Sequence, residues 1–297
     1  MAKKKKIFTA KMNQSTAGKI FDVFNYVFLC LFTVVMIVPL LYVIVGSFSS
    51  SGMVQMQFGA FTLDAYDTII HSKRTLTSIW NSVVITVGGT ALKITVTTMT
   101  AYVLSKNFLP GRKVFMTIVM FFMLFSIGLV PNYIFVANSM HLKNTYWAIW
   151  LPCLISSYNL IVMMNSFRAL PASIEESARL DGCNDAQSFL HIALPMSTAS
   201  IATFTLFYAV DLWNDYMKAT IFLDNADLWP ITIWLRQYIV LSTTNILDEV
   251  SDYARPWIPS QALKYATIVV GTLPIICLYP FVQRYFTKGV LLGSIKG

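Results

Sequence analysis

The stretch that decides the fold is residues 168–195, which read RALPASIEESARLDGCNDAQSFLHIALP and lie between two apolar blocks. Ser173 followed by Glu176 has the spacing of a capping box, which can start a helix. Gly182 should stop that helix, because glycine accepts the left-handed backbone conformation that many helix ends require. The first half of the stretch therefore predicts one short helix that ends at Gly182.

The second half of the stretch carries a start signal of its own. Asn184 followed by Gln187 can begin another short helix. Pro195 then stands just before the next apolar block. We expect two short helices hinged at Gly182.

Long apolar blocks make up most of the remaining chain. Of the 297 residues, 56% are hydrophobic and 12% are charged, whereas ordinary globular domains carry about 25% charged residues. A bilayer core takes about 20 apolar residues per helix. The blocks of this length run from about Val23 to Ser47, Ile79 to Leu104, Val114 to Ala137, Tyr146 to Met164, Thr198 to Leu223 and Leu263 to Phe286. The sequence predicts an all-α membrane protein with six transmembrane helices.

Lysine and arginine residues set the expected orientation. They concentrate before the first block, after the second, after the fourth and after the sixth, and such flanks face the cytoplasm. The prediction is a cytoplasmic segment 1–22, a membrane domain 23–288 and a cytoplasmic tail 289–297, in the cell membrane. The net charge of +8 is explained by this topology signal near anionic lipid, so we expect no nucleic-acid partner.

A family resemblance enters at the 168–195 stretch. Glu-Ser-Ala-Arg-Leu-Asp-Gly, nine further residues and Ile-Ala-Leu-Pro resemble the EAA loop of ABC importer permeases, whose pattern is E-A-A-x-x-x-G, nine residues, then I-x-L-P. Ser177 replaces one alanine of the pattern. Residues 127–133, 207–214 and 279–297 resemble the maltose-permease-like carbohydrate branch, especially its members for complex or polysaccharide-derived oligosaccharides. The matching positions of the loop are Glu176, Ala178, Gly182, Ile192, Leu194 and Pro195.

The resemblance implies a type I ABC importer architecture with a coupling segment at about residues 168–196. The implied partners are a second homologous permease, two ABC ATPase subunits and an extracytoplasmic sugar-binding protein, and the implied substrate is an oligosaccharide. ATP and Mg would be bound by the ATPase partners. The chain itself has no GxxxxGK[ST] loop, so we expect it to bind no cofactor and to be no enzyme.

The resemblance also implies roles for single residues of the coupling segment. Glu176 and Asp181 would contact the ATPase or cap helices. Ala178 and Gly182 would permit close approach. Ile192 and Leu194 would anchor the second short helix to the bundle, and Pro195 completes the matching positions.

Polar residues inside the apolar blocks mark a candidate substrate pathway, because ionisable groups in a membrane usually face a cavity or the bundle interior. Lys93 lies midway along the second block, and Asp211, Trp213, Asn214 and Asp215 lie in the fifth. Carboxylates, amides and aromatic rings suit sugars, and a lysine suggests acidic sugars such as uronates as a hypothesis. Asp211 and Asp215 are four residues apart, a like-charge arrangement that Lys93 or Lys218 could relieve. The alternative is a structural polar cluster at the permease–permease contact, or snorkelling near the membrane surface, especially by Lys218.

Other functions stay open at the level of the sequence. An ion-coupled secondary transporter would usually have more helices in repeated halves. A structural membrane assembly subunit would show no nucleotide stimulation by any partner. A membrane enzyme would need a convergent catalytic set, and a metal site would need clustered ligands; the scattered cysteines and histidines provide neither.

Overall fold

The computed structural model describes residues 16–50, 59–125, 127–241 and 260–293. Within these ranges the chain consists of helices joined by short loops, and the extended pairing is an isolated bridge between Ser49 and Phe61. The elements are α1 (Thr16–Ser47), α2 (Asp64–His71), α3 (Lys73–Ser105), α4 (Arg112–Leu124), α5 (Leu129–Ile134), the π-helix η1 (Phe135–Ser139), α6 (Trp147–Trp150), α7 (Ser157–Arg168), α8 (Ala172–Leu180), α9 (Asp185–Ser188), the π-helix η2 (Phe189–Ala193), α10 (Leu194–Met196), α11 (Thr198–Asn214), α12 (Tyr216–Phe222), the 3₁₀-helix η3 (Ala226–Leu228), α13 (Ile231–Leu241) and α15 (Ser260–Gly293).

Three of the predicted apolar blocks form single long helices: α1, α3 and α15. Pro39 lies inside α1 without breaking it. Among the described residues, α1 from Gly18 onward and α3 are long and apolar enough to cross a membrane, and two bent helix pairs also qualify if each pair is one crossing. The count of six crossings stays a prediction.

The other three blocks are broken, which corrects the continuous helices expected there. The third block divides into α4 and α5, whose axes differ by 117°. Pro131 lies in the first turn of α5, where a missing N–H is tolerated but a continuing helix would be disrupted. The fourth divides into α6 and α7 around Pro152. The fifth ends α11 at Asn214, and the Asp215 side chain then caps α12, a position that aspartate favours.

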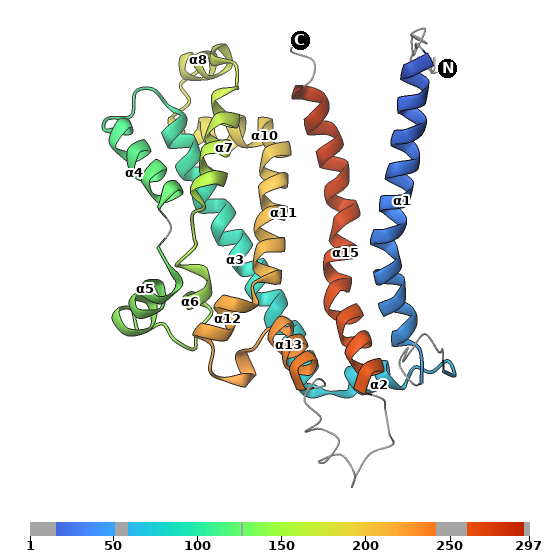
Figure 1. Cartoon of the computed structure of the whole chain (residues 1–297). Helices are drawn as coiled ribbons and strands as arrows, with labels where there is room; N and C mark the ends of the chain where they lie inside the picture. Colours follow the sequence, from blue (N-terminus) through green and yellow to red (C-terminus); the bar gives the residue numbers. More distant parts are fainter. Residues whose placement is uncertain (1–15, 51–58, 126, 242–259, 294–297) are drawn as a thin grey trace.

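The two ends of the helical bundle differ in what they carry (Figure 1). The first turn of α1, the last turn of α15 and the short helix α8 lie at the same end. At the opposite end lie α2, α12 and α13. The described ends of α1 and α15 thus lie on the same side as α8, whereas the placement of both termini in the cytoplasm stays a prediction.

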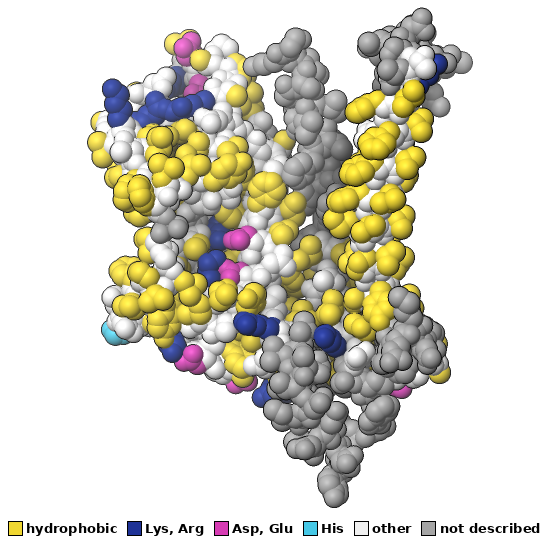
Figure 2. Space-filling model, viewed as in Figure 1, with side chains coloured by type: hydrophobic (Ala, Val, Ile, Leu, Met, Phe, Trp, Pro, Cys, Tyr) yellow, Lys and Arg dark blue, Asp and Glu magenta, His cyan; other side chains and the backbone are white. Residues whose placement is uncertain are grey.

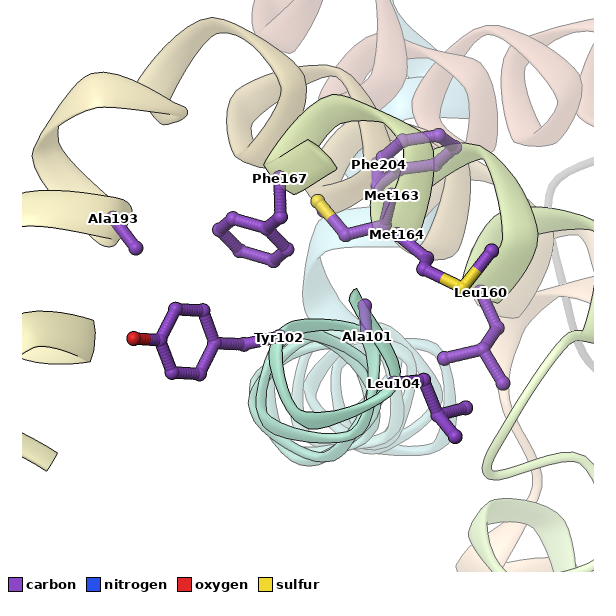
Figure 3. Packing of buried hydrophobic residues seen from close by; sticks show 9 residues of the cluster. All are labelled: Ala101, Tyr102, Leu104, Leu160, Met163, Met164, Phe167, Ala193 and Phe204. Carbon is purple, nitrogen blue, oxygen red and sulfur yellow. The ribbon is translucent and has the colours of Figure 1, made fainter. Parts of the chain in front are cut away.

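Helix α3 is the central element, because α7, α11 and α13 all contact it. Near its C-terminal end, Tyr102 makes an edge-to-face contact with Phe167 of α7, with ring centroids 5.7 Å apart. Figure 3 shows the apolar cluster at this end, formed by Ala101, Tyr102, Leu104, Leu160, Met163, Met164, Phe167, Ala193 and Phe204. In a membrane, such interlocked packing holds helices together where hydrophobic burial gives little.

Close helix contact in the middle of α3 depends on two glycines. A Cβ on Gly89 would lie 2.7 Å from carbons of both Trp150 and Leu212, and one on Gly88 would lie 2.9 Å from Trp150. The Trp150 indole N–H also donates to the Ile85 carbonyl at 3.0 Å. Gly88 and Gly89 therefore let neighbouring helices approach closely.

Large apolar surfaces stay uncovered within this chain (Figure 2). The apolar side chains of α1 are exposed along its length, and α4 has no buried residue. Apolar patches of this extent are rare on soluble monomers and indicate contact with lipid or protein. By contrast, α13 of the long segment after the fifth block is packed against α3, where the Ile231 N–H donates to the Ser82 hydroxyl at 2.8 Å.

Candidate functional site

A cavity of about 520 Å³ lies among α3, the irregular stretch before α7, α11 and α12. Its lining is mixed, with charged, amide, hydroxyl and aromatic groups. In Figure 2, basic and acidic side chains appear together at mid-height, between apolar bands. The lining residues are Lys93, Pro152, Cys153, Ile155, Ser156, Asn159, Phe207, Tyr208, Asp211 and Lys218.

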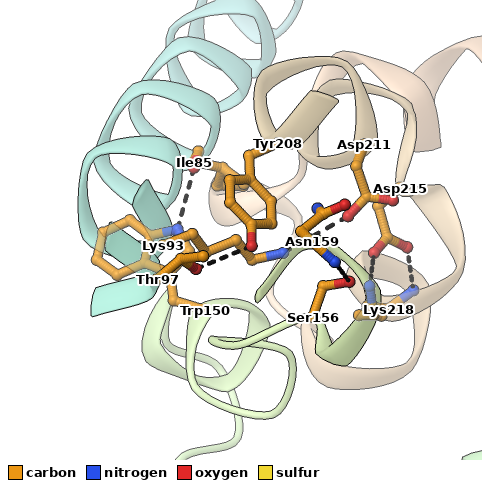
Figure 4. A network of polar contacts seen from close by, with 10 residues as sticks. All are labelled: Ile85, Lys93, Thr97, Trp150, Ser156, Asn159, Tyr208, Asp211, Asp215 and Lys218. Carbon is orange, nitrogen blue, oxygen red and sulfur yellow. Dashed lines mark hydrogen bonds and ion pairs between the residues drawn. The ribbon is translucent and has the colours of Figure 1, made fainter. Parts of the chain in front are cut away.

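Lys93 is the buried cation of this cavity (Figure 4). Its side chain is 2% exposed, and its Nζ lies 3.5 Å from Asp211 Oδ2. Nζ also lies 5.4 Å from the ring centroid of Tyr208, whose hydroxyl bonds to that of Thr97 at 2.9 Å. The tyrosine ring is therefore fixed beside the lysine, while the Asp211 side chain remains 59% exposed.

Lys218 belongs to a second ion pair in the same region. Its ammonium group pairs with the Asp215 carboxylate, and the other oxygen of that carboxylate accepts the backbone N–H of Lys218 at 3.1 Å. The two residues are three apart at the start of α12. Each aspartate thus has its own lysine, which is how the predicted repulsion between Asp211 and Asp215 is relieved.

The predicted two-helix stretch forms as expected around Gly182. This glycine has φ +85°, the left-handed value. The N–H of Cys183 donates to Ala178 O at 2.9 Å, and the N–H of Gly182 donates to Arg179 O at 3.1 Å. These two bonds define a Schellman end for α8, so the interpretation of Gly182 as the helix stop is confirmed.

The two helix starts of the stretch differ from each other. Asn184 and Gln187 form the predicted capping box, with reciprocal bonds of 2.8 and 2.9 Å. The predicted box at Ser173 is absent: the N-cap of α8 is Pro171, two residues earlier, and it makes no side-chain cap bond. The proline ring fixes φ near −65°, and Pro171, with φ −62° and ψ 123°, has the extended conformation that is typical of an N-cap.

An ion pair ties α8 to the end of α3. Lys106 pairs with Glu175, and the exposed fractions of the two side chains are 12% and 23%. The Lys106 Nζ also lies 4.2 Å from the ring centroid of Tyr102. Both residues border a second hollow, of about 540 Å³. Glu176 lies on its rim and stays exposed.

Comparison with known proteins decides the family. The model for "Binding-protein-dependent transport system inner membrane component" matches residues 93–292. This chain belongs to that family. The matched range includes both the cavity and the stretch around Gly182, so the geometry above is that of a transport-system membrane component.

Individual relatives cover nearly the full length. Protein LplC of Bacillus subtilis (strain 168) is 42% identical over 96% of this chain and 98% of its own. The polygalacturonan/rhamnogalacturonan transport system permease protein YtcP of the same strain is 41% identical over 94% of this chain and 99% of its own.

A solved structure matches the fold. A chain in the crystal structure of a bacterial ABC transporter involved in the import of the acidic polysaccharide alginate has a TM-score of 0.84 and 30% identity. The match covers 92% of this chain and 99% of that chain. The chain therefore has an ABC importer permease fold.

The predicted pathway residues of this family member separate into two groups. Lys93 and Asp211 line the cavity, and Asp215 adjoins it through Lys218. Trp213 is 6% exposed, and its indole N–H donates to the Gly271 carbonyl of α15 at 3.1 Å. Trp213 therefore packs between helices of this chain, and Asn214 is exposed outside the cavity lining.

The cavity also contains residues that the sequence did not single out. Phe207 and Tyr208 lie one helical turn before Asp211, so the spacing of neighbours on a helix face would have found them. Ser156 and Asn159 come from the start of α7. They could be placed here only once the break in the fourth block was known.

The predicted coupling residues differ in burial. Ala178 is 7% exposed and packs inside the chain, whereas the neighbouring Leu180 is 89% exposed. Ala193 is fully buried between two half-buried neighbours, Ile192 and Leu194. Of the predicted coupling residues, Glu176, Asp181, Gly182 and Pro195 are exposed.

Proposed function

We propose that this chain is one of two permease subunits of an ATP-driven ABC importer for oligosaccharides, and that it forms half of the translocation pathway. The observation that carries the proposal is near full-length relatedness, 41%, to a permease named for polygalacturonan and rhamnogalacturonan transport. The related crystal structure concerns alginate import. Both names describe carbohydrate polymers, which supports an oligosaccharide as the substrate.

The cavity supports a role in the pathway. Its volume, about 520 Å³, lies within the range of about 300–1,000 Å³ that is usual for small-ligand sites. The amide of Asn159 and the ring of Phe207 are in its lining. Sugar hydroxyls need polar partners and sugar ring faces need aromatic ones, so Lys93 and Asp211 would act there together with these groups.

The segment 168–196 supports coupling to an ATPase. Leu180, at the end of α8, is 89% exposed, and next to it are the exposed Asp181 and the left-handed Gly182. An apolar tip with an adjacent carboxylate is suited to insertion into a cleft of another protein. The Lys106–Glu175 pair would then pass a displacement of α8 to α3, since coupling needs a physical link between the two sites.

The remaining partners follow from the proposal. Two ATPase subunits would bind ATP and Mg on the cytoplasmic side. A second permease and lipid would cover the exposed apolar faces of α1 and α4. The family description itself includes dependence on a binding protein, which would deliver the sugar from outside the cell.

Affinity purification from native membranes in mild detergent, with mass spectrometry of the co-purified proteins, tests the proposal. We expect a second permease and an ABC ATPase. The variant Gly182→Arg should lose the ATPase, because a bulky side chain costs about 1–2 kcal/mol in the left-handed conformation and obstructs the tip. The matched control is Gly182→Asn, since asparagine tolerates that conformation and should keep the ATPase.

A second variant protects the test from a folding defect in Gly182→Arg. Replacing both Glu176 and Asp181 by alanine changes exposed groups only and should also release the ATPase. Recovery of the chain alone, under conditions that keep other ABC importers assembled, would contradict the proposal. An ion-coupled transporter or a structural assembly subunit would then explain the chain better.

A further inference from the structure

The cavity holds two lysine–aspartate pairs, and the two pairs are built differently (Figure 4). The Lys218–Asp215 pair is local: its members are three residues apart, and their side chains are 22% and 11% exposed. Asp215 is also held by the backbone N–H of Lys218. This aspartate caps α12 and cannot leave its lysine without uncapping the helix.

The Lys93–Asp211 pair joins α3 to α11 instead. Its two members are unequally buried, because the Lys93 side chain is 2% exposed and that of Asp211 is 59% exposed. The Nζ–Oδ2 distance of 3.5 Å is long for a charge-assisted hydrogen bond, which usually measures about 2.7–2.9 Å. No other hydrogen bond of Asp211 is present among the described residues.

The unequal burial has a chemical consequence. A buried ammonium group needs a negative partner, because an unpaired charge away from water is costly. Lys93 is enclosed by its own helix and by the ring of Tyr208, so it stays in place. Asp211 reaches solvent and can turn away without losing hydration. The position opposite Lys93 can therefore be taken by another carboxylate.

We propose that Lys93 binds a carboxylate of an acidic oligosaccharide in the pathway, and that Asp211 is the internal counter-ion that this carboxylate replaces. The inference rests on the proposed function and adds the substrate class, uronate-containing oligosaccharides, and the residues that select it. Uronate carboxylates stand on the sugar ring, so a carboxylate held at Lys93 places that ring near the amide of Asn159 and the exposed ring of Phe207, which both line the cavity.

Asp211 has a second effect in this arrangement. When substrate leaves, Asp211 pairs again with Lys93, so the empty cavity holds no unpaired buried cation. The competition weakens carboxylate binding, which suits a pathway, because a transported group must be bound strongly enough to enter and weakly enough to leave. A neutral sugar has no charge with which to displace Asp211 and gains nothing from Lys93.

Equilibrium binding to the purified complex of both permeases and their ATPases tests the inference, with no binding protein present. The probes are trigalacturonate and its fully methyl-esterified form, which keeps the rings but lacks the charges. We expect Lys93→Met to weaken trigalacturonate binding by about 10-fold to 100-fold, the usual range for losing a charged hydrogen bond. The affinity for the methyl ester should not change. Lys93→Arg should retain most of the binding.

The aspartate variant should change the affinity for trigalacturonate in the opposite direction. Asp211→Asn removes the internal competitor, so trigalacturonate should bind several-fold more tightly while the ester is unaffected. Lys143→Met is the matched control, because Lys143 pairs with Asp224 away from the cavity; it should change neither probe.

Other outcomes would overturn the inference. Equal losses for acid and ester in Lys93→Met would mean a structural lysine, and weaker trigalacturonate binding in Asp211→Asn would refute the competition. Equal affinity of the wild-type complex for both probes would refute selectivity for acidic sugars. If ATP-dependent oligosaccharide uptake is observed in the same preparation, the proposed function still stands. If no ATPase assembles and no uptake occurs, the proposed function fails and this inference fails with it.

Discussion

Two lysines of the same helix region form ion pairs of opposite character. Lys93 lies in the middle of α3 and Lys106 follows its last residue, about 20 Å further along the axis at 1.5 Å per residue. Both are largely buried, and both lie over a tyrosine ring. They differ in the acid: Glu175 is 23% exposed, whereas Asp211 is 59% exposed.

The difference teaches how the burial of the partner decides what an ion pair can do. Lys106 and Glu175 are both enclosed, so their pair acts as a fixed connection between α3 and α8. Asp211 can exchange its lysine for water, so the Lys93 pair can open. One helix would thus carry a permanent link at the end and an exchangeable pair in the middle.

The largest expected effect is a difference in stability between variants of the two members of the Lys93–Asp211 pair. Asp211→Asn leaves a buried ammonium group unpaired and should destabilise the protein by about 3 kcal/mol, at the low end for breaking a buried pair. Lys93→Met leaves an exposed carboxylate, which water solvates, and should cost much less. Thermal unfolding of the purified complex measures the stability of both variants. Added trigalacturonate should restore the stability of Asp211→Asn.

Equal destabilisation by Asp211→Asn and Lys93→Met would contradict this asymmetry. It would mean that both charges depend on each other equally and that Asp211 cannot leave.

An intermediate effect is expected at the fixed connection. Lys106→Met removes the pair with Glu175 and its contact with Tyr102, and losing a hydrogen bond to a charged group costs about 2 kcal/mol. ATP hydrolysis should then continue with several-fold less sugar moved per ATP, because α8 no longer drives α3. Proteoliposomes that report uptake and hydrolysis together provide the ratio.

Lys106→Arg is the matched control, since it keeps the charge and should keep the ratio. An unchanged ratio in Lys106→Met would show that displacement of α8 reaches the bundle by another route, such as the packing of Ala193.

The smallest effect is expected at an exposed pair, Lys143–Asp224, with an Nζ–Oδ2 distance of 2.6 Å. Hydrogen bonding to Asp224 raises the pKa of Lys143 above its ordinary value. The folded-state pKa is the higher one, so any stabilisation is complete below the ordinary lysine pKa and is lost only as the pH rises through the raised value. Throughout pH 6 to about 9 that stabilisation is present in full, but it is small because both side chains are exposed to solvent. Lys143→Met should therefore leave the unfolding midpoint nearly unchanged, and by the same small amount at every pH in this range.

A measurable fall in the midpoint for Lys143→Met would show that this pair contributes more than exposed pairs usually do. The contrast between burial and exposure, on which the ranking of the three pairs depends, would then need revision.

The features that depend on near neighbours could be predicted from the sequence. The stop at Gly182 and the capping box of Asn184 and Gln187 were predictable, because their hydrogen bonds join residues at most five apart. The absent box at Ser173 shows the limit of that logic, since the N-cap of the helix is Pro171, two residues earlier. The helical membrane character and the family followed from composition and from the 168–195 motif.

The cavity, by contrast, could be recognised only from the packed structure. Lys93 and Asp211 are 118 residues apart in sequence, and nothing local pairs them. The pairing needs α3 and α11 to pack closely, the fourth block to break so that Ser156 and Asn159 complete the wall, and Asp215 to end α11. The sequence suggested Trp213 as a pathway residue together with its neighbours Asp211 and Asn214, yet Trp213 packs on Gly271 of α15.

The physical reason is the range of the interactions. Helix starts and stops are set by hydrogen bonds within one or two turns, which a linear sequence displays directly. The packing of whole helices and the positions of their breaks decide which polar side chains face a common cavity. Adjacent positions on a helix point about 100° apart, so a shift of one residue changes which side chain faces the cavity. The sequence therefore determined the class of this protein, and the packing of its helices decided which charges face each other.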